Sequence, residues 1–279
     1  MTKFFRLFTV FFLLSLIGYS QISKIHYIPP LTANDLQQGG GGSIPYDQHL
    51  YLSTPSTSDV TVKITILSTG QEITYTDLRN DNPKVYQLTA DNPNQEQALN
   101  GVLFVDKDGT GSNRLSSGLV IDADCPVYAS IRYNAGAQAG ALVSKGDASL
   151  GTHFRTGMMT NGNQSDENEF QNSTNSHNLN FISVMATQDN TTVRIDLPNA
   201  SPNLQIANYN YNGNPIVQTL NRNESMIIAA DARQPNNSGE NRFALIGALV
   251  RSIDDSGTVI VEDPTKPIVV NVGLSLIHI

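Results

Sequence analysis

The chain has 279 residues, with 17 Lys and Arg against 25 Asp and Glu, a formal net charge of −8 and one cysteine. An acidic surface without a Lys/Arg cluster repels phosphate backbones, so the composition speaks against a nucleic-acid partner. A single cysteine excludes an intrachain disulfide, so stability must come from one large hydrophobic core or two smaller ones.

The N-terminus has the features of a signal peptide over residues 1–20. Lys3 and Arg6 precede an apolar run from Leu7 to Ile17, and a small residue, Ser20, stands before the expected cleavage point at Gln21. The run is shorter than the roughly 20 apolar residues of a membrane-spanning helix, so an uncleaved anchor is the weaker alternative. We therefore expect a secreted protein that does not insert in the membrane after cleavage.

Residues 21–43 are expected to form an N-terminal segment and a Gly-rich linker, because Gly39 to Gly42 are four consecutive glycines. From residue 44 the pattern changes. Apolar β-branched residues alternate with polar ones from Val60 to Ile66 and again from Val193 to Leu197, which is typical of half-buried strands. Further strands are predicted at Val127–Tyr133, Ser225–Ala229, Leu245–Val250, Val259–Val261 and Ile268–Val272.

An internal repeat refines this picture. Leu52–Ile64 matches Val184–Ile195 at an offset of 131 residues, each copy being an apolar strand, a polar turn and an alternating strand, which we interpret as a hairpin. Cys125–Ile131 likewise corresponds to Lys266–Val272. With no helical periodicity after residue 20, the prediction is an all-β fold of two similar sandwich-like units in tandem, packed together. Common β-hairpin sequence patterns are the alternative explanation of the match.

The first unit is placed at residues 44–150 and the second at 151–273, after a polar loop at about 161–178. Residues 274–279 follow a strand without a polar closing segment, which indicates a truncated end. The loop from Asn161 to Asn178 is a candidate binding loop, and a disordered linker is the other interpretation.

Several segments resemble the N-terminal domain of the IgGFc-binding protein family, in the form found in surface proteins of gliding Bacteroidetes. They are Phe181–Val193, Gln138–Gly146 with Leu150–Arg155, Leu220–Ser225 and Lys266–Asn271, and the resemblance extends over roughly residues 44–273. It implies a secreted, non-enzymatic binding or adhesion module, often followed by other extracellular domains and a type IX secretion signal. Immunoglobulin binding comes from animal members and is not expected here.

No catalytic residue is predicted. The five histidines are scattered singly, and neither a nucleophile elbow nor an HExxH motif is present. A glycosidase needs only two carboxylates, so a glycoside hydrolase stays as a less favoured alternative. Cys125 begins an apolar alternation and is expected to be a small buried hydrophobe rather than a reactive thiol.

The acidic segment Asp106–Asn113 contains the one candidate cofactor site. Asp106, Asp108 and Ser112 could supply oxygen ligands to Ca²⁺, but the closing Glu of an EF-hand is absent. Because Asp-Gly is also a common turn, a plain turn is the favoured interpretation and otherwise no cofactor is expected.

The favoured function is a cell-surface binding or adhesion module for an extracellular glycan or protein. Tyr128, Tyr133, Tyr209 and Tyr211 are the candidate ligand-binding residues. A structural spacer within a larger surface protein is the alternative. A concave surface with clustered Tyr, Asn and Asp would favour the binding module, whereas a featureless surface would favour the spacer.

Overall fold

The computed structural model describes residues 21–32, 45–89, 102–111, 113–135, 138–157, 179–198, 201, 203–231, 241, 243–254 and 261–274. The signal peptide, the glycine run, the polar loop at 161–178 and residues 275–279 lie outside them. Regular structure in these ranges is β-strand, apart from short helical turns such as Lys107–Gly109 and Gly146–Ser149, which confirms the all-β class. No helix within them is long and apolar enough to cross a membrane.

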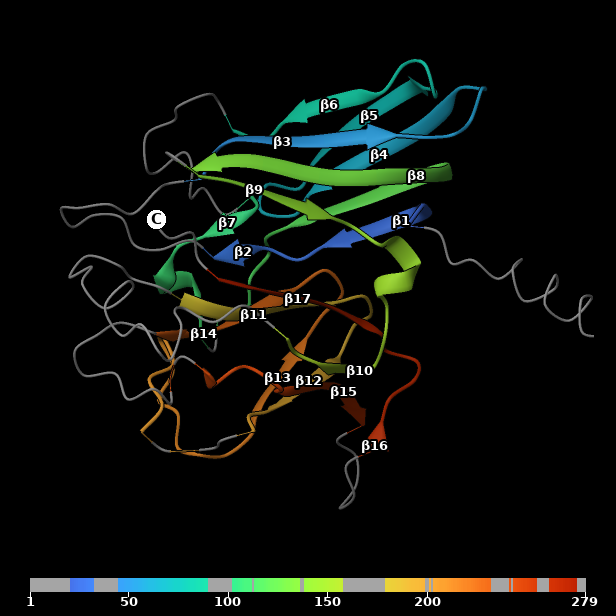
Figure 1. The fold of residues 1–279 in the computed structure, drawn as a ribbon. Coiled ribbons are helices and arrows are strands. Elements are labelled where there is room, and N and C mark those ends of the chain that lie inside the picture. The colour runs from blue at the N-terminus through green and yellow to red at the C-terminus, as the bar shows by residue number, and fades with distance from the viewer. Residues whose placement is uncertain are drawn as a thin grey trace, which may run out of the picture.

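One long strand, β8 (Leu119–Ala135), organises the first unit (Figure 1). Its first half pairs with β1 and β4, and its second half pairs with β3 and β9. Two sheets therefore share β8, in the orders β5-β4-β8-β1 and β6-β3-β8-β9. The other strands are β1 (Ser23–Ile28), β3 (Tyr46–Ser53), β4 (Val60–Ile66), β5 (Gln71–Leu78), β6 (Lys84–Gln87) and β9 (Gln138–Val143).

The alternation along β4 decides which of its faces is buried. Val60, Val62 and Ile64 are fully buried, whereas Thr61 is exposed. Each buried aliphatic side chain of this size stabilises the fold by about 1.5–3 kcal/mol. They form the first core with buried residues of β3 and β8, namely Leu50, Leu52, Ile121 and Ile131.

Cys125 is exposed, so the expectation of a buried thiol was wrong. Because Cys125 is two residues from Ala123 and from Val127, which are buried, alternation would place it on the same face of β8. It lies, however, where β8 passes from one sheet to the other. The pairing with β4 ends at Ala123, and the pairing with β3 begins at Tyr128. Neither strand pairs with the intervening residues, and Asp124, Cys125 and Pro126 are exposed in succession.

The second unit also consists of two sheets. One has the order β10-β15-β12-β13, with β16 paired to β15, and the other has the order β14-β11-β17. The strands are β10 (His153–Arg155), β11 (Leu179–Ala186), β12 (Thr191–Asp196), β13 (Ile216–Leu220), β14 (Ser225–Asp231), β15 (Leu249–Asp254), β16 (Val261–Glu262) and β17 (Ile268–Leu274). Val193 and Ile195 are fully buried in the second core, as the alternation predicted.

The two units have the same strand order along the chain. Five antiparallel pairings of the first unit recur in the second. β1·β8 corresponds to β10·β15, β4·β8 to β12·β15, and β4·β5 to β12·β13. In the same way β3·β8 corresponds to β11·β17, and β3·β6 to β11·β14. The register recurs too, since Leu50 opposite Ile131 corresponds to Ile182 opposite Val272. The repeated strand-turn-strand is not a hairpin, however. β3 and β4 do not pair with each other, because β4 pairs with the first half of β8 and β3 with its second half. β11 and β12 lie in different sheets.

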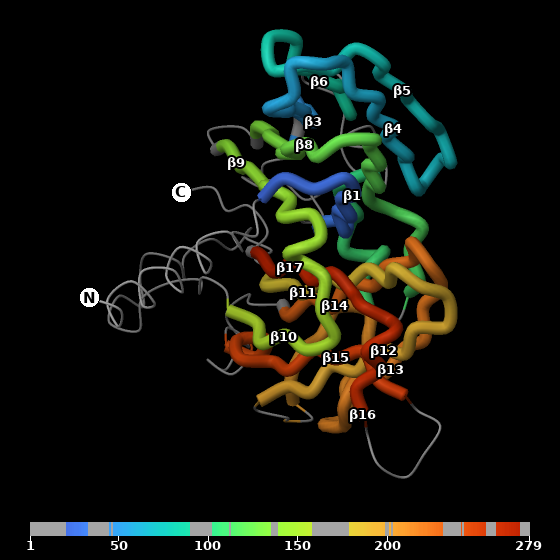
Figure 2. The backbone as a smooth tube through the Cα atoms, turned by 90° about the vertical axis from the view of Figure 1, so that its right-hand side faces the viewer, coloured from blue at the N-terminus to red at the C-terminus, as the bar shows by residue number. Residues whose placement is uncertain are grey.

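The β14-β11-β17 sheet lies between the first unit and the other sheet of the second unit (Figures 1 and 2). Every residue of β11 is buried. Its Leu179 and Phe181 pack in the first core, whereas Ile182 and Val184 pack in the second. A short parallel pair, β2 (Leu31–Thr32) and β7 (Phe104–Val105), supplies apolar residues to the first core. The two units therefore share a middle layer.

Two predicted boundaries need correction. The first unit includes β1, which the boundary at residue 44 left outside, although it pairs with β8 from Ser23 to Ile28. The predicted strand at Leu245–Val250 is mostly turn, because β15 begins only at Leu249. Gly247 has a φ of +77°, which interrupts an apolar run that otherwise resembles a strand.

Candidate functional site

The outer face of the β6-β3-β8-β9 sheet carries a group of exposed aromatic and aliphatic side chains. In the described part of the chain, seven large hydrophobic side chains are exposed, and four of them lie on this face: Tyr51, Val85, Tyr128 and Val143. Single exposed apolar residues are ordinary, but their gathering on one face is typical of an interaction site. We call this surface the tyrosine face; it consists of these four residues with His49 and Arg132.

The register of the sheet places these side chains in rows. Tyr51 lies opposite both Val85 and Ser130, and Ser130 lies opposite Val143, so one row crosses four strands. In the next row His49 lies opposite Arg132. The rows are in contact, because the Arg132 guanidinium is 5.2 Å from the centre of the Tyr51 ring. A cation over an aromatic ring at this distance is attracted by its π electrons.

A recess of about 650 Å³ adjoins the rows. Asp47, His49, Tyr51, Arg132 and Asn134 line it from β3 and β8. Three small residues of β9, Ala139, Gly140 and Ala141, form another wall and leave the space open. A volume of this size is within the usual range of ligand sites.

Irregular backbone at the start of β3 positions the polar rim of this recess. The pairing with β8 shifts by one residue between Tyr46 and His49, which is a β-bulge, and Asp47 has a φ of +47°. Asn134 Nδ2 donates to Asp47 Oδ2 over 2.8 Å, and His49 Nδ1 donates to the Asp47 carbonyl over 2.8 Å. The bulge therefore holds a carboxylate beside an amide and an imidazole.

Gly140 makes room for an aromatic ring on the core side of the same sheet. A Cβ at this position would lie 2.3 Å from the Tyr133 ring, so the lack of a side chain at Gly140 leaves room for that ring beside β9. Tyr133 then packs edge-on against Phe104, with ring centres 4.9 Å apart. Burial raises the pKa of the Tyr133 hydroxyl. Tyr133 thus supports the recess from the core side.

The site offers mixed chemistry to a ligand. Tyr51 and Tyr128 provide aromatic surface, Arg132 and Asn134 provide donors, and Asp47 provides acceptors. In neutral His49 the proton on Nδ1 is held by the Asp47 carbonyl, which leaves Nε2 as an acceptor. The described residues contain no group of three or more His, Cys, Asp or Glu that could hold a metal ion.

The four candidate tyrosines do not come together. Tyr128 is 41% exposed on the tyrosine face, whereas Tyr133 faces the first core. Tyr211 is 5% exposed in the second core and Tyr209 packs against that core. Burial, followed by the proximity of Tyr209 and Asp196, raises the pKa of Tyr211. Of the four, Tyr128 alone is an exposed residue that a partner can contact on the tyrosine face.

The candidate Ca²⁺ segment forms a capped turn. Asp106 Oδ1 accepts a hydrogen bond of 2.9 Å from the Gly109 N–H, which caps the short helical turn Lys107–Gly109. The main chain of Asp108 accepts a hydrogen bond from Asn113 Nδ2 over 3.0 Å. Ser112, the third proposed ligand, lies outside the described residues. Asp106 therefore has a structural role as the cap of this turn.

Sequence reasoning missed Tyr51, His49 and Arg132. These residues alternate with buried Leu50, Leu52 and Ile131, so a period of two was present as a signal. The pairing of β3 with β8 that brings them together is not visible in the sequence, because it joins residues about 80 positions apart.

A family model described as IgGFc binding protein matches residues 139–279. This is just over half of the chain and covers β9 from its second residue onward and the whole second unit. The chain belongs to the IgGFc binding protein family. The match is narrower than the resemblance over residues 44–273. Of the tyrosine face it includes Val143, and the other five residues precede it. A comparison with curated proteins finds no match.

Proposed function

We propose that this member of the IgGFc binding protein family is a secreted, non-catalytic binding or adhesion module, and that the tyrosine face is its ligand-binding surface. The observation that carries the proposal is the gathering of Tyr51, Tyr128, Val85 and Val143 on one sheet face, beside a recess with a polar rim. A purely structural spacer has no need for such a face. Membership of a binding-protein family supports the same conclusion.

The residue types favour a protein as the ligand. Tyr and Arg are enriched among the residues that dominate protein interfaces, and Arg132 over Tyr51 combines both. The polar groups at the rim, Asp47 and Asn134, fit the more solvated border of such an interface. A glycan, which would stack on Tyr128 and bind Asp47 and Asn134, is the second ligand class that the test distinguishes.

The test is an array of extracellular proteins and glycans, probed with the chain and with a Tyr51→Ala/Arg132→Ala double variant. Removal of residues that dominate an interface costs about 2 kcal/mol or more, so at least a 30-fold loss of affinity is expected. Val217→Ala is the matched control, because Val217 is 44% exposed on β13 of the second unit. Equal binding by both variants would remove the tyrosine face as the site, and an array without ligands would favour the spacer.

Secretion and the absence of catalysis have separate tests. Cleavage before Gln21 is expected, and N-terminal sequencing of the exported protein measures it; a product that keeps Met1 on a membrane would contradict it. Incubation with a panel of polysaccharides should release no reducing sugar. Release that depends on a carboxylate of this chain would favour the glycoside hydrolase.

A further inference from the structure

The repeat predicts a strand that the described second unit lacks. In the first unit β9 covers the outer edge of β8, pairing from Ser130 to Ala135. The equivalent strand of the second unit is β17, and Asn271 occupies the place of Ser130. Within the described residues β17 pairs with β11 alone, and it is the edge of its sheet. Among the residues that the structure describes, none fills in the second unit the place that β9 fills in the first.

Contacts at the start of β17 and at the matching point of β8 support the equivalence of these two strands. Ser23 of β1 lies opposite Val127 of β8, and Gly151, just before β10, forms a bridge with Ile268 of β17. Ile268 exchanges both main-chain hydrogen bonds with Gly151, so its N–H and C=O point to the outer edge. Groups on a strand alternate in direction, so Val270 and Val272 also present N–H and C=O there. Unpaired groups of this kind are templates for a further strand.

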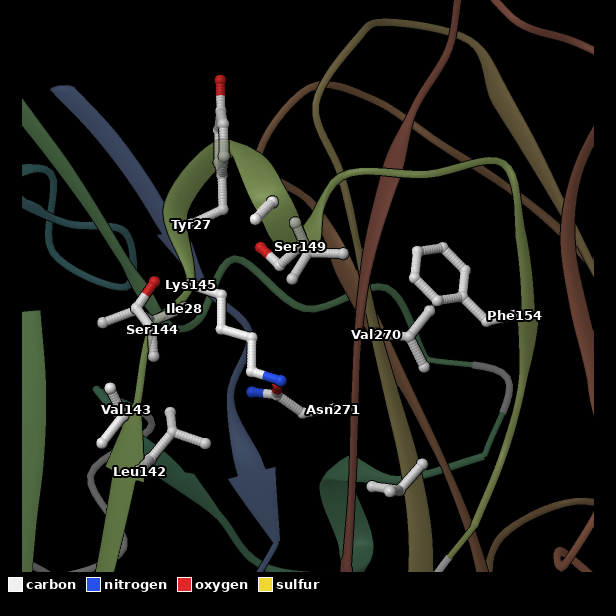
Figure 3. Close-up of a pocket in the computed structure, with 13 residues that line it drawn as sticks. Tyr27, Ile28, Leu142, Val143, Ser144, Lys145, Ser149, Phe154, Val270 and Asn271 are labelled. Carbon is white, nitrogen blue, oxygen red and sulfur yellow. The ribbon is translucent and has the colours of Figure 1, made fainter. Parts of the chain in front are cut away.

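A cavity of about 380 Å³ lies along this edge (Figure 3). Leu142, Val143 and Ser144 of the β9 segment line one side, and residues 269–272 of β17 line the other. Both sides mix apolar and polar side chains, with Lys145 beside Leu142 on one and Asn271 beside Val270 on the other. Two exposed valines flank the opening, Val143 at 51% and Val272 at 36%. The cavity therefore suits an extended chain with alternating apolar residues.

Two polar groups in the cavity indicate one further property of the occupant. Asn271 Nδ2 is buried without a hydrogen-bond partner in the described structure. The Lys145 and Asn271 side chains extend toward each other from the two sides of the cavity (Figure 3). A buried donor without a partner is costly, and an acidic side chain between an ammonium and an amide would satisfy both.

We propose that the outer edge of β17 binds an extended segment of a partner protein, which adds a β-strand opposite Val270–Leu274. The segment alternates apolar residues and places one Asp or Glu against Asn271 and Lys145. Main-chain hydrogen bonds to Val270 and Val272 supply affinity, and the cavity supplies specificity. This site uses none of the residues of the tyrosine face except Val143, and it is independent of the function proposed above.

The experiment pans a phage-displayed library of random heptapeptides against the purified chain. The enriched peptides should alternate Val or Ile with polar residues and contain Asp or Glu. Val272→Pro removes an outward N–H without breaking the pairing with β11, and it should weaken these peptides at least 10-fold. Lys145→Glu should weaken acidic peptides and enrich Lys-containing ones. Val217→Ala, which changes an exposed residue of β13 outside both sites, is the control that should leave peptide binding unchanged.

Three results would overturn the proposal. One is a library without enriched peptides, and another is equal binding to the chain and to both Lys145→Glu and Val272→Pro. The third is self-association of the chain that Val272→Pro abolishes, because a second copy would then fill the edge. Lys145→Glu is an exposed substitution outside the strands, so it tests the site even where Val272→Pro lowers the yield of folded protein.

Discussion

Phe181→Ala is expected to destabilise both units, although Phe181 belongs to the second. The side chain is 4% exposed and packs in the first core from the middle sheet. Phe→Ala substitutions in cores cost about 3–5 kcal/mol. Here the ring lies over Gly273, where a Cβ would approach it to 2.5 Å, so the neighbouring strand has no side chain to fill the void. The upper half of that range is therefore expected.

For a chain of this size, each kcal/mol lowers the melting temperature by about 2–4 °C, so the expected shift is about 8–20 °C. The assay that locates the effect is amide hydrogen exchange, read on β4 of the first unit and β12 of the second. Faster exchange is expected in both strands. Val217→Ala, which changes an exposed residue, is the control and should leave both unchanged. Unchanged exchange in β4 beside faster exchange in β12 would refute the shared middle layer.

Three further predictions concern the cores and the charges. Ile64→Asp or Ile195→Asp buries an unpaired charge and should abolish the yield of soluble protein. Thr61→Asp and Thr192→Asp, on the opposite faces, should lower that yield only slightly. An equal loss of yield from both kinds of substitution would mean that these strands are buried on both faces. Burial lowers the pKa of His26 below its usual 6.5, against the opposing effects of the Val127 carbonyl and Asp147, so the unfolded chain binds the proton more readily. Stability should then be full above about pH 6.5 and fall as the pH drops below it; His26→Gln should flatten this slope in urea titrations, and an unaltered slope would contradict the assignment. Asp196 accepts hydrogen bonds from Arg194 and from Arg251, which lie opposite each other on β12 and β15. Asp196→Asn should therefore lower the free energy of unfolding, measured by thermal unfolding, by about 1 kcal/mol, and by less in high salt. A loss of stability that does not depend on salt would argue against charge as the cause.

The sequence by itself determined the fold class and the buried faces of its clearest strands. Alternation from Val60 to Ile66 and from Val193 to Leu197 identifies the inward residues, because a strand places successive side chains on opposite faces. The internal match at 131 residues also indicated the duplication, which the strand pairings reproduce in the same order. These features are local, so a pattern of a few residues is enough to reveal them.

Only the tertiary structure decided which surfaces are free. Alternation could not show that β11 is buried on both faces, since the second face is covered by a different unit. It could not show that Cys125 is exposed, because the residue lies where the two sheets that share β8 separate. The tyrosine face and the open edge of β17 depend on pairings between distant strands, and the energies of those pairings are set by packing across the whole core rather than by neighbours in the sequence.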